Sequence, residues 1–260
     1  MRESWERRVN RAALLAEGGG AIQPLMLAYT HVLGLQRDCH AALQKVAASL
    51  SGLLERDLDV LRPCVPPMLT AIADAGPPPL VDDARRLLAS GPSDLDAHLL
   101  AGWRTASGQD FFAKMILQPY AQYLTEVDIR PAGRDLPAGE SACPFCGSLA
   151  QLSILHSSGT ADGGGRQLLC ATCLTRWPFR RIRCAFCGEE DERRLGYFRS
   201  EIFEHLRVDG CDTCRRYLKT VDLTRLGLAV PIVDEVAGAS LDLWAIEQGY
   251  QKIELNLMGL

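Results

Sequence analysis

Apolar side chains in the first half of the chain recur every three or four residues, which is the spacing of amphipathic helices. Between residues 22 and 58 they share one helix face, and Gly34 and Gly52 mark points where that helix is expected to bend or break. Further helices are predicted over residues 65–74, 81–89, 95–106 and 110–126. Residues 1–128 are therefore predicted to form an all-helical domain.

Proline and small polar residues indicate where these helices are expected to begin or to be interrupted. Pro119 lies inside the helix predicted over 110–126, where it is expected to kink or split the helix because it lacks an amide hydrogen. Ser93 or Asp94 is expected to cap the helix over 95–106, and Ser107 the helix that follows it.

The pattern changes after residues 129–141, where the sequence IRPAGRDLPAGES has two prolines, two glycines and no periodicity. Such a composition is typical of a linker between domains. Short β-like runs follow at residues 149–156, 166–169, 193–198 and 217–223, with a mobile hairpin loop expected at 157–165. A closing helix is predicted over 234–248.

The second half of the chain also contains an internal repeat built around cysteine. CPFCG at 143–147 recurs as CAFCG at 184–188, and CATC at 170–173 recurs as CDTC at 211–214, so both motifs return after 41 residues. Phe145, Gly147 and Thr172 have counterparts at the same offset in Phe186, Gly188 and Thr213. A repeat that preserves this spacing indicates a duplicated structural unit.

A CxxC pair in a tight turn points two sulfurs at one metal ion, and glycine after the second cysteine allows the positive φ that this turn favours. We group Cys143, Cys146, Cys170 and Cys173 as the first site, and Cys184, Cys187, Cys211 and Cys214 as the second. An interleaved grouping stays open, because only ten residues separate Cys173 from Cys184. Four disulfides would need an oxidising compartment, and thioredoxin-type pairs would need a strand-to-helix setting, so metal binding is favoured.

The chemistry of the two sites follows from their ligands. Four thiolates close a tetrahedral shell and leave no position for a reactive water, so a hydrolytic centre is not expected. Sulfur ligands suit both zinc and iron, so the ligand type does not choose between them. Leu174 and Arg215, and not glycine, follow the second CxxC pair of each site, which departs from a strict rubredoxin pattern.

The predicted fold class is α+β. It comprises a helical domain (1–128), a linker (129–141), two tandem rubredoxin-like or zinc-ribbon modules (142–181 and 182–225), and a C-terminal helix and tail (226–260). Cys39 and Cys64, in the helical part, are expected to be buried free thiols.

Composition and the search for other motifs narrow the function further. The chain has 260 residues, 47% of them hydrophobic, and a formal net charge of -4, which indicates neither a nucleic-acid partner nor stable membrane insertion. We find no secretory signal, P-loop, dinucleotide-binding motif, serine-hydrolase motif or closely spaced histidine pair. The protein is therefore not expected to be an enzyme, and no catalytic or organic-cofactor residue is assigned.

The runs RQLLCATCLTRWPFRRIRCAFCG at 166–188 and GCDTCRRYLKTVDL at 210–223, with the tail over 233–250, resemble the FdhE family of formate dehydrogenase accessory proteins. The resemblance is specific over about residues 140–250, whereas in the helical half only helix content and order agree. It implies a cytoplasmic assembly factor that contacts the catalytic, molybdenum-containing subunit of respiratory formate dehydrogenase before its export. It also implies iron at the two rubredoxin-like sites, with zinc as the alternative, and the eight cysteines above as ligands.

Two functions therefore remain in view. The first is a non-enzymatic maturation factor that binds the formate dehydrogenase catalytic subunit. The alternative is a rubredoxin-like electron-transfer or redox-sensing protein. A zinc-ribbon nucleic-acid binder ranks last, because the excess of basic residues around the cysteines is small and forms no continuous stripe.

Overall fold

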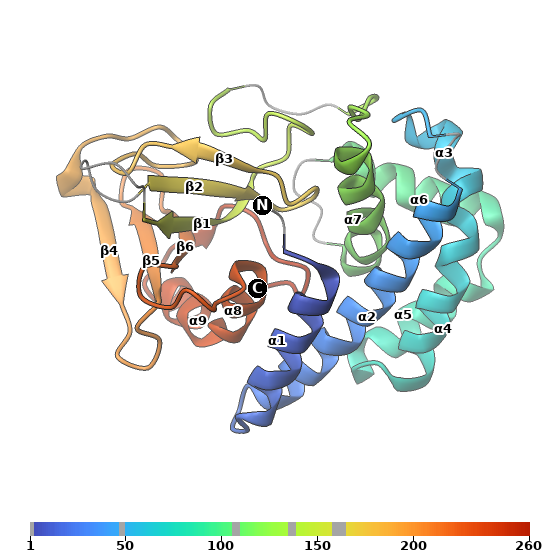
Figure 1. Ribbon diagram of the computed structural model, residues 1–260, viewed down its shortest axis with the longest axis horizontal. Coiled ribbons are helices and arrows are strands. Elements are labelled where there is room, and N and C mark those ends of the chain that lie inside the picture. The colour runs from blue at the N-terminus through green and yellow to red at the C-terminus, as the bar shows by residue number, and fades with distance from the viewer. Residues whose placement is uncertain (1–2, 47–49, 106–109, 135–138, 158–164) are drawn as a thin grey trace.

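The computed structural model describes residues 3–46, 50–105, 110–134, 139–157 and 165–260. A helical part and a sheet part lie side by side, and the two C-terminal helices lie beneath the sheet (Figure 1). This arrangement confirms the predicted α+β fold class. Within the described residues, no helix has both the length and the apolarity needed to cross a membrane.

The helical part is built from seven α-helices and one 3-10 turn among the described residues. They are α1 (Trp5–Glu17), α2 (Gln23–Lys45), α3 (Leu54–Leu61), η2 (Arg62–Cys64), α4 (Val65–Ala75), α5 (Pro78–Ala89), α6 (Pro92–Arg104) and α7 (Phe111–Glu126). Helix α2 runs through Gly34 without a break, whereas Gly52 lies between α2 and α3 with a φ of 78°. A Cβ atom at Gly52 would meet the carbonyl oxygen of Arg130 at 2.5 Å, so only glycine fits at this turn.

Helix α7 corrects the expectation that Pro119 splits its helix. The helix is continuous from Phe111 to Glu126 with Pro119 inside it. Proline cannot donate to the carbonyl of Met115, and the side chain of Gln36 on α2 donates to that carbonyl instead, at 3.0 Å. A donor from a neighbouring helix therefore replaces the missing backbone hydrogen bond, and burial of most of α7 holds the helix together.

The expected helix caps also need correction. Helix α6 begins at Pro92, next to Gly91, and no side chain caps it, so Ser93 and Asp94 lie within its first turn. Ser107 lies outside the described residues. Asp110 caps α7 instead, and its carboxylate accepts from the amide of Ala113 at 3.0 Å.

The described strands form one mixed sheet in the order β3-β2-β1-β6-β5-β4, with β7 paired to β6. They are β1 (Ala150–His156), β2 (Gly165–Cys170), β3 (Arg176–Phe179), β4 (Leu195–Arg199, after the 3-10 turn η3, Glu192–Arg194), β5 (Leu206–Cys211), β6 (Arg216–Asp222) and β7 (Gln251–Lys252). Each repeat contributes three antiparallel strands, and the parallel pairing of β1 with β6 joins the repeats. Strands β3 and β5 were not predicted. Most of the hairpin loop expected at 157–165 lies outside the described residues.

The C-terminal segment forms two helices, α8 (Pro231–Ala237) and α9 (Ala239–Glu247), where one helix was predicted over 234–248. Gly238 separates them, and a Cβ atom there would meet Leu206 at 2.6 Å. The sharp turn and the close approach to β5 together explain the break. The proposed division of the chain into domains, with its boundary at 129–141, stays a prediction.

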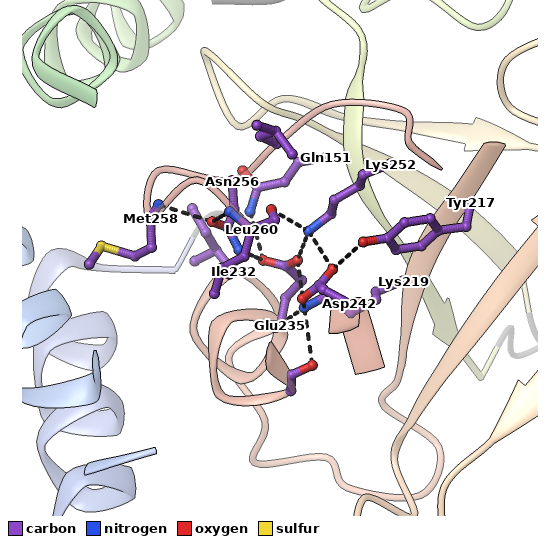
Figure 2. A network of polar contacts seen from close by, with 12 residues as sticks. Gln151, Tyr217, Lys219, Ile232, Glu235, Asp242, Lys252, Asn256, Met258 and Leu260 are labelled. Atoms are coloured by element: carbon purple, nitrogen blue, oxygen red, sulfur yellow. Dashed lines mark hydrogen bonds and ion pairs between the residues drawn. The ribbon is translucent and has the colours of Figure 1, made fainter. Parts of the chain in front are cut away.

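A fully buried network of charges fixes α8 and α9 beneath the sheet (Figure 2). Lys219 on β6 contacts Glu235 at 2.9 Å and also pairs with Asp242, while Lys252 on β7 pairs with both carboxylates. Tyr217 donates to Asp242 at 2.7 Å. Two ammonium groups thus balance two carboxylates, which is the condition under which buried charges are tolerated.

We predict that Glu235→Gln destabilises the fold by about 3–5 kcal/mol, because it leaves two buried ammonium groups with one carboxylate. Denaturant unfolding measures the change. Glu55→Gln serves as the control, because its carboxylate pairs with Arg104 at the surface; we expect less than about 1 kcal/mol there. An equal effect of the two substitutions would contradict this role of the network.

The same network predicts a pH dependence. Burial alone would raise the pKa of Glu235, but the ammonium groups of Lys219 and Lys252 outweigh it and hold that pKa at about 2, below the ordinary 4.5. The stability that Glu235 contributes is therefore present above pH 4.5 and is lost as the pH falls toward 2. Urea unfolding at several acidic pH values should show this slope in the native chain and a shallower one in Glu235→Gln.

Candidate metal centres

The first candidate centre lies at the start of the sheet part, around the turn before β1. Cys143 and Cys146 occupy the turn before β1, Cys170 ends β2, and Cys173 lies in the turn between β2 and β3. The sulfurs of Cys143 and Cys173 are 3.6 Å apart, and those of Cys146 and Cys170 are 3.4 Å apart. All four sulfurs lie within 4.8 Å of one another and are buried.

The second candidate centre repeats this geometry 41 residues later. Cys184 and Cys187 form the turn before β4, Cys211 ends β5, and Cys214 lies in the turn between β5 and β6. The sulfur pairs Cys184–Cys214 and Cys187–Cys211 are each 3.7 Å apart, and all four sulfurs again lie within 4.8 Å. The structure thus groups the eight cysteines sequentially, and does not interleave them.

Backbone conformation explains why these turns form. Gly147 and Gly188 follow the first CxxC pair of each repeat with φ values of 77° and 79°. Leu174 and Arg215, which follow the second pairs, have the same left-handed conformation with φ of 55° despite their side chains. The departure from glycine noted in the sequence therefore leaves the shape of the turn unchanged.

The sulfur positions fit a tetrahedral metal ion. A metal–sulfur distance of about 2.3 Å gives sulfur–sulfur edges of about 3.8 Å, close to the distances of the two sulfur pairs described above for each quartet. A disulfide would require about 2.05 Å, and all ten cysteines are free thiols in the structure. Burial raises the pKa of Cys170 and Cys173. Cysteine ligates a metal as the thiolate, so binding of an ion at this quartet would release protons. Each quartet can therefore hold one ion of zinc or iron.

Residues that the sequence did not single out complete the first centre. Arg134, from the predicted linker, donates to the carbonyl of Cys146 at 3.1 Å and to Oγ of Ser148 at 3.0 Å. Ser148 also bonds Thr172 at 2.8 Å. The sequence around Arg134 has no pattern that would mark this arginine as part of a metal site. Position 148 can be found by aligning the two repeats, because its serine corresponds to Glu189 in the second repeat.

Cys39 and Cys64 lie apart from both quartets, in the helical part. Both are buried, as expected, and the thiol of Cys64 lies 3.9 Å from the carbonyl of Cys39. Among the described residues, three histidines pair with carboxylates: His40 with Glu126, His98 with Asp110 and His205 with Asp234. None belongs to either quartet.

Comparison with known families agrees with this geometry. Residues 142–181 match the family model described as FdhE, central domain, and residues 182–258 match FdhE, C-terminal domain. Together the two models match residues 142–258, which are the sheet part and the C-terminal helices of this chain. The resemblance read from the sequence is thereby confirmed.

Individual relatives support the assignment over part of their length. A protein FdhE homolog from Aquifex aeolicus is 41% identical over 117 residues, which are 45% of this chain and 41% of that protein. A homolog from Edwardsiella ictaluri is 28% identical over 184 residues, covering 68% of this chain and 58% of that protein. The matched part of the chain thus spans between two and three fifths of these relatives.

A solved structure extends the likeness to the whole fold. The crystal structure of the FdhE protein from Pseudomonas aeruginosa matches 99% of this chain and 97% of that chain with a TM-score of 0.74. The sequence identity is 21%, so this match shows the shared fold alone. It includes the helical part, which the family models do not match.

We predict that the reduced protein binds two metal ions per chain, and that Cys184→Ser with Cys187→Ser lowers this to one. Elemental analysis of anaerobically purified protein measures both values. Cys39→Ser is the control, because Cys39 lies outside the quartets and both ions should remain. An unchanged metal content in the double variant would contradict the grouping of ligands.

Proposed function

We propose that this protein is a metal-binding accessory protein that assists the maturation of respiratory formate dehydrogenase by binding its catalytic subunit. The match of residues 142–258 to the two FdhE family models is the observation that carries the proposal. The eight cysteines would ligate two ions, iron as first choice and zinc as the alternative. The location that follows from this role is the cytoplasm, where the catalytic subunit is made.

The chemistry of the quartets supports a binding role over an enzymatic one. Four sulfurs complete the coordination of each ion, so neither centre offers a site to water or substrate. Bound ions would cross-link the strand ends at these cysteines and, if they are iron, would supply a one-electron couple. The protein's own residues then act by presenting a stable surface to a partner.

Contacts between the helical part and the sheet part make one surface out of two. Arg11 on α1 pairs with Asp234 on α8 through both carboxylate oxygens. Gln118 on α7 donates to the carbonyl of Ala171, next to the first centre, at 2.7 Å. These contacts hold the helical part and the sheet part together, as a partner-binding surface that spans both parts would require.

Electron transfer or redox sensing is the second candidate function. It is favoured by the exposure of Cys187 at the second centre, which would bring an iron ion close to solvent. Reversible bleaching of the visible spectrum at a physiological potential would support this function.

We predict that the tagged full chain, purified without oxygen, captures the catalytic subunit of formate dehydrogenase from cells that express both. The catalytic subunit of an unrelated molybdenum enzyme is the control and should stay in the flow-through. A double variant Cys184→Ser with Cys187→Ser should capture less, because the strand ends around the second centre lose their ion. No capture by metal-loaded protein, with the client present, would overturn the assembly role.

A further inference from the structure

The two quartets differ in their access to solvent. At the first centre Cys170 and Cys173 are 0% exposed, and Cys143 and Cys146 are at most 5% exposed. At the second centre Cys187 is exposed and Cys214 is half-buried. Two of the four cysteines of the second centre are therefore open to solvent in the folded protein, whereas all four of the first are buried.

The centres differ as well in the hydroxyl groups around the sulfurs. Ser148 Oγ lies 3.4 Å from the sulfur of Cys146, and Thr175 Oγ1 lies 3.2 Å from the sulfur of Cys173. A hydroxyl in this position donates to a thiolate and offsets part of its negative charge. Both centres also have an amide donor, from Thr172 to Cys170 at 3.3 Å and from Phe186 to Cys184 at 3.4 Å, so the hydroxyl groups are what distinguishes them.

The residues that correspond to Ser148 and Thr175 in the second repeat have no hydroxyl group. Forty-one residues after Ser148 and Thr175 stand Glu189 and Arg216. The carboxylate of Glu189 accepts from Thr213 at 2.6 Å, so it adds negative charge beside the quartet where Ser148 adds a donor. Arg216 lies over the ring of Phe186, 4.8 Å from its centre, and donates to the backbone of Lys252.

The first centre is also held from outside its own repeat. The guanidinium of Arg134 donates to the carbonyl of Cys146 and lies 4.5 Å from the ring centre of Trp103 in the helical part. Gln118 on α7 donates to the carbonyl of Ala171, which lies in the turn of the second CxxC pair. Opening the first quartet would therefore break contacts with the helical part, whereas Cys187 and Cys214 of the second quartet are already open to solvent.

We propose that the two centres have different tasks: the first holds its ion as a permanent structural link, and the second exchanges its ion and is the one that thiols, chelators and redox partners reach. This inference rests on the metal-binding part of the proposed function and does not depend on the client. Its ligand class is a soft donor, such as a small thiol, that displaces Cys187 or Cys214 from the ion.

The test follows zinc release from the full chain, loaded with two equivalents and challenged with excess 4-(2-pyridylazo)resorcinol. We expect one equivalent in a fast phase and one in a slow phase, with rates at least about tenfold apart, because only the slow one requires local unfolding. The variant Cys184→Ser with Cys187→Ser should retain the slow phase alone. Release of both ions in one phase, or a fast phase in this double variant, would overturn the proposal.

A matched pair of substitutions at corresponding positions sharpens the test. Ser148→Ala should accelerate the slow phase and leave the fast phase unchanged. Glu189→Ser, which restores the hydroxyl of the first repeat, should slow the fast phase and leave the slow phase unchanged. The reverse pattern would contradict the role given to these side chains.

The difference between the centres can also be tested on the protein without substitutions. Timed alkylation of the zinc-loaded protein with N-ethylmaleimide, read by mass spectrometry, should label Cys187 and Cys214 before any cysteine of the first quartet. Equal labelling would count against the proposal. Protein that binds no metal would refute the proposed metal-binding function itself, whereas two ions that leave together would refute only the difference between the centres.

Discussion

Closure of each sulfur quartet is the constraint on which the sheet part of this protein depends. In each repeat one CxxC turn precedes the first strand and the other joins the second strand to the third, so one ion would tie both ends of the unit together. Metal binding by small domains of this kind has apparent free energies of about 10–16 kcal/mol. This is comparable to the whole net stability of a typical domain, about 5–15 kcal/mol.

The two repeats do not form separate sheets, because strands β1 and β6 pair and place both repeats in one sheet. Beneath that sheet, Lys219, Lys252, Glu235 and Asp242 anchor the C-terminal helices to its underside (Figure 2). Arg11 on α1 pairs with Asp234 on α8. The helical part is therefore attached both to a CxxC turn of the first centre and to the C-terminal helices beneath the sheet. The binding surface proposed above therefore depends on long-range contacts in every layer.

Duplication followed by divergence accounts for the chemistry of the two centres. The cysteines and the turns around them are the same in both repeats, and the side chains next to the sulfurs differ. Where Ser148 bonds Thr172 beside the first quartet, Glu189 accepts from Thr213 beside the second. One arrangement of four sulfurs is thus kept in two environments, one enclosed and one open to solvent.

The sequence alone determined those features that depend on neighbours a few residues away: the helices of the first half after α1, although the pattern predicts α2 and α3 as one helix, the CxxC turns and the spacing of the repeat. Only the tertiary structure decided what depends on distant partners. Pro119 stays within a helix because Gln36 replaces its missing donor, and the C-terminal helix breaks at Gly238 because β5 lies against it. The enclosure of one quartet and the exposure of Cys187 in the other likewise arise from which elements pack over each turn, and local residue patterns do not encode that packing.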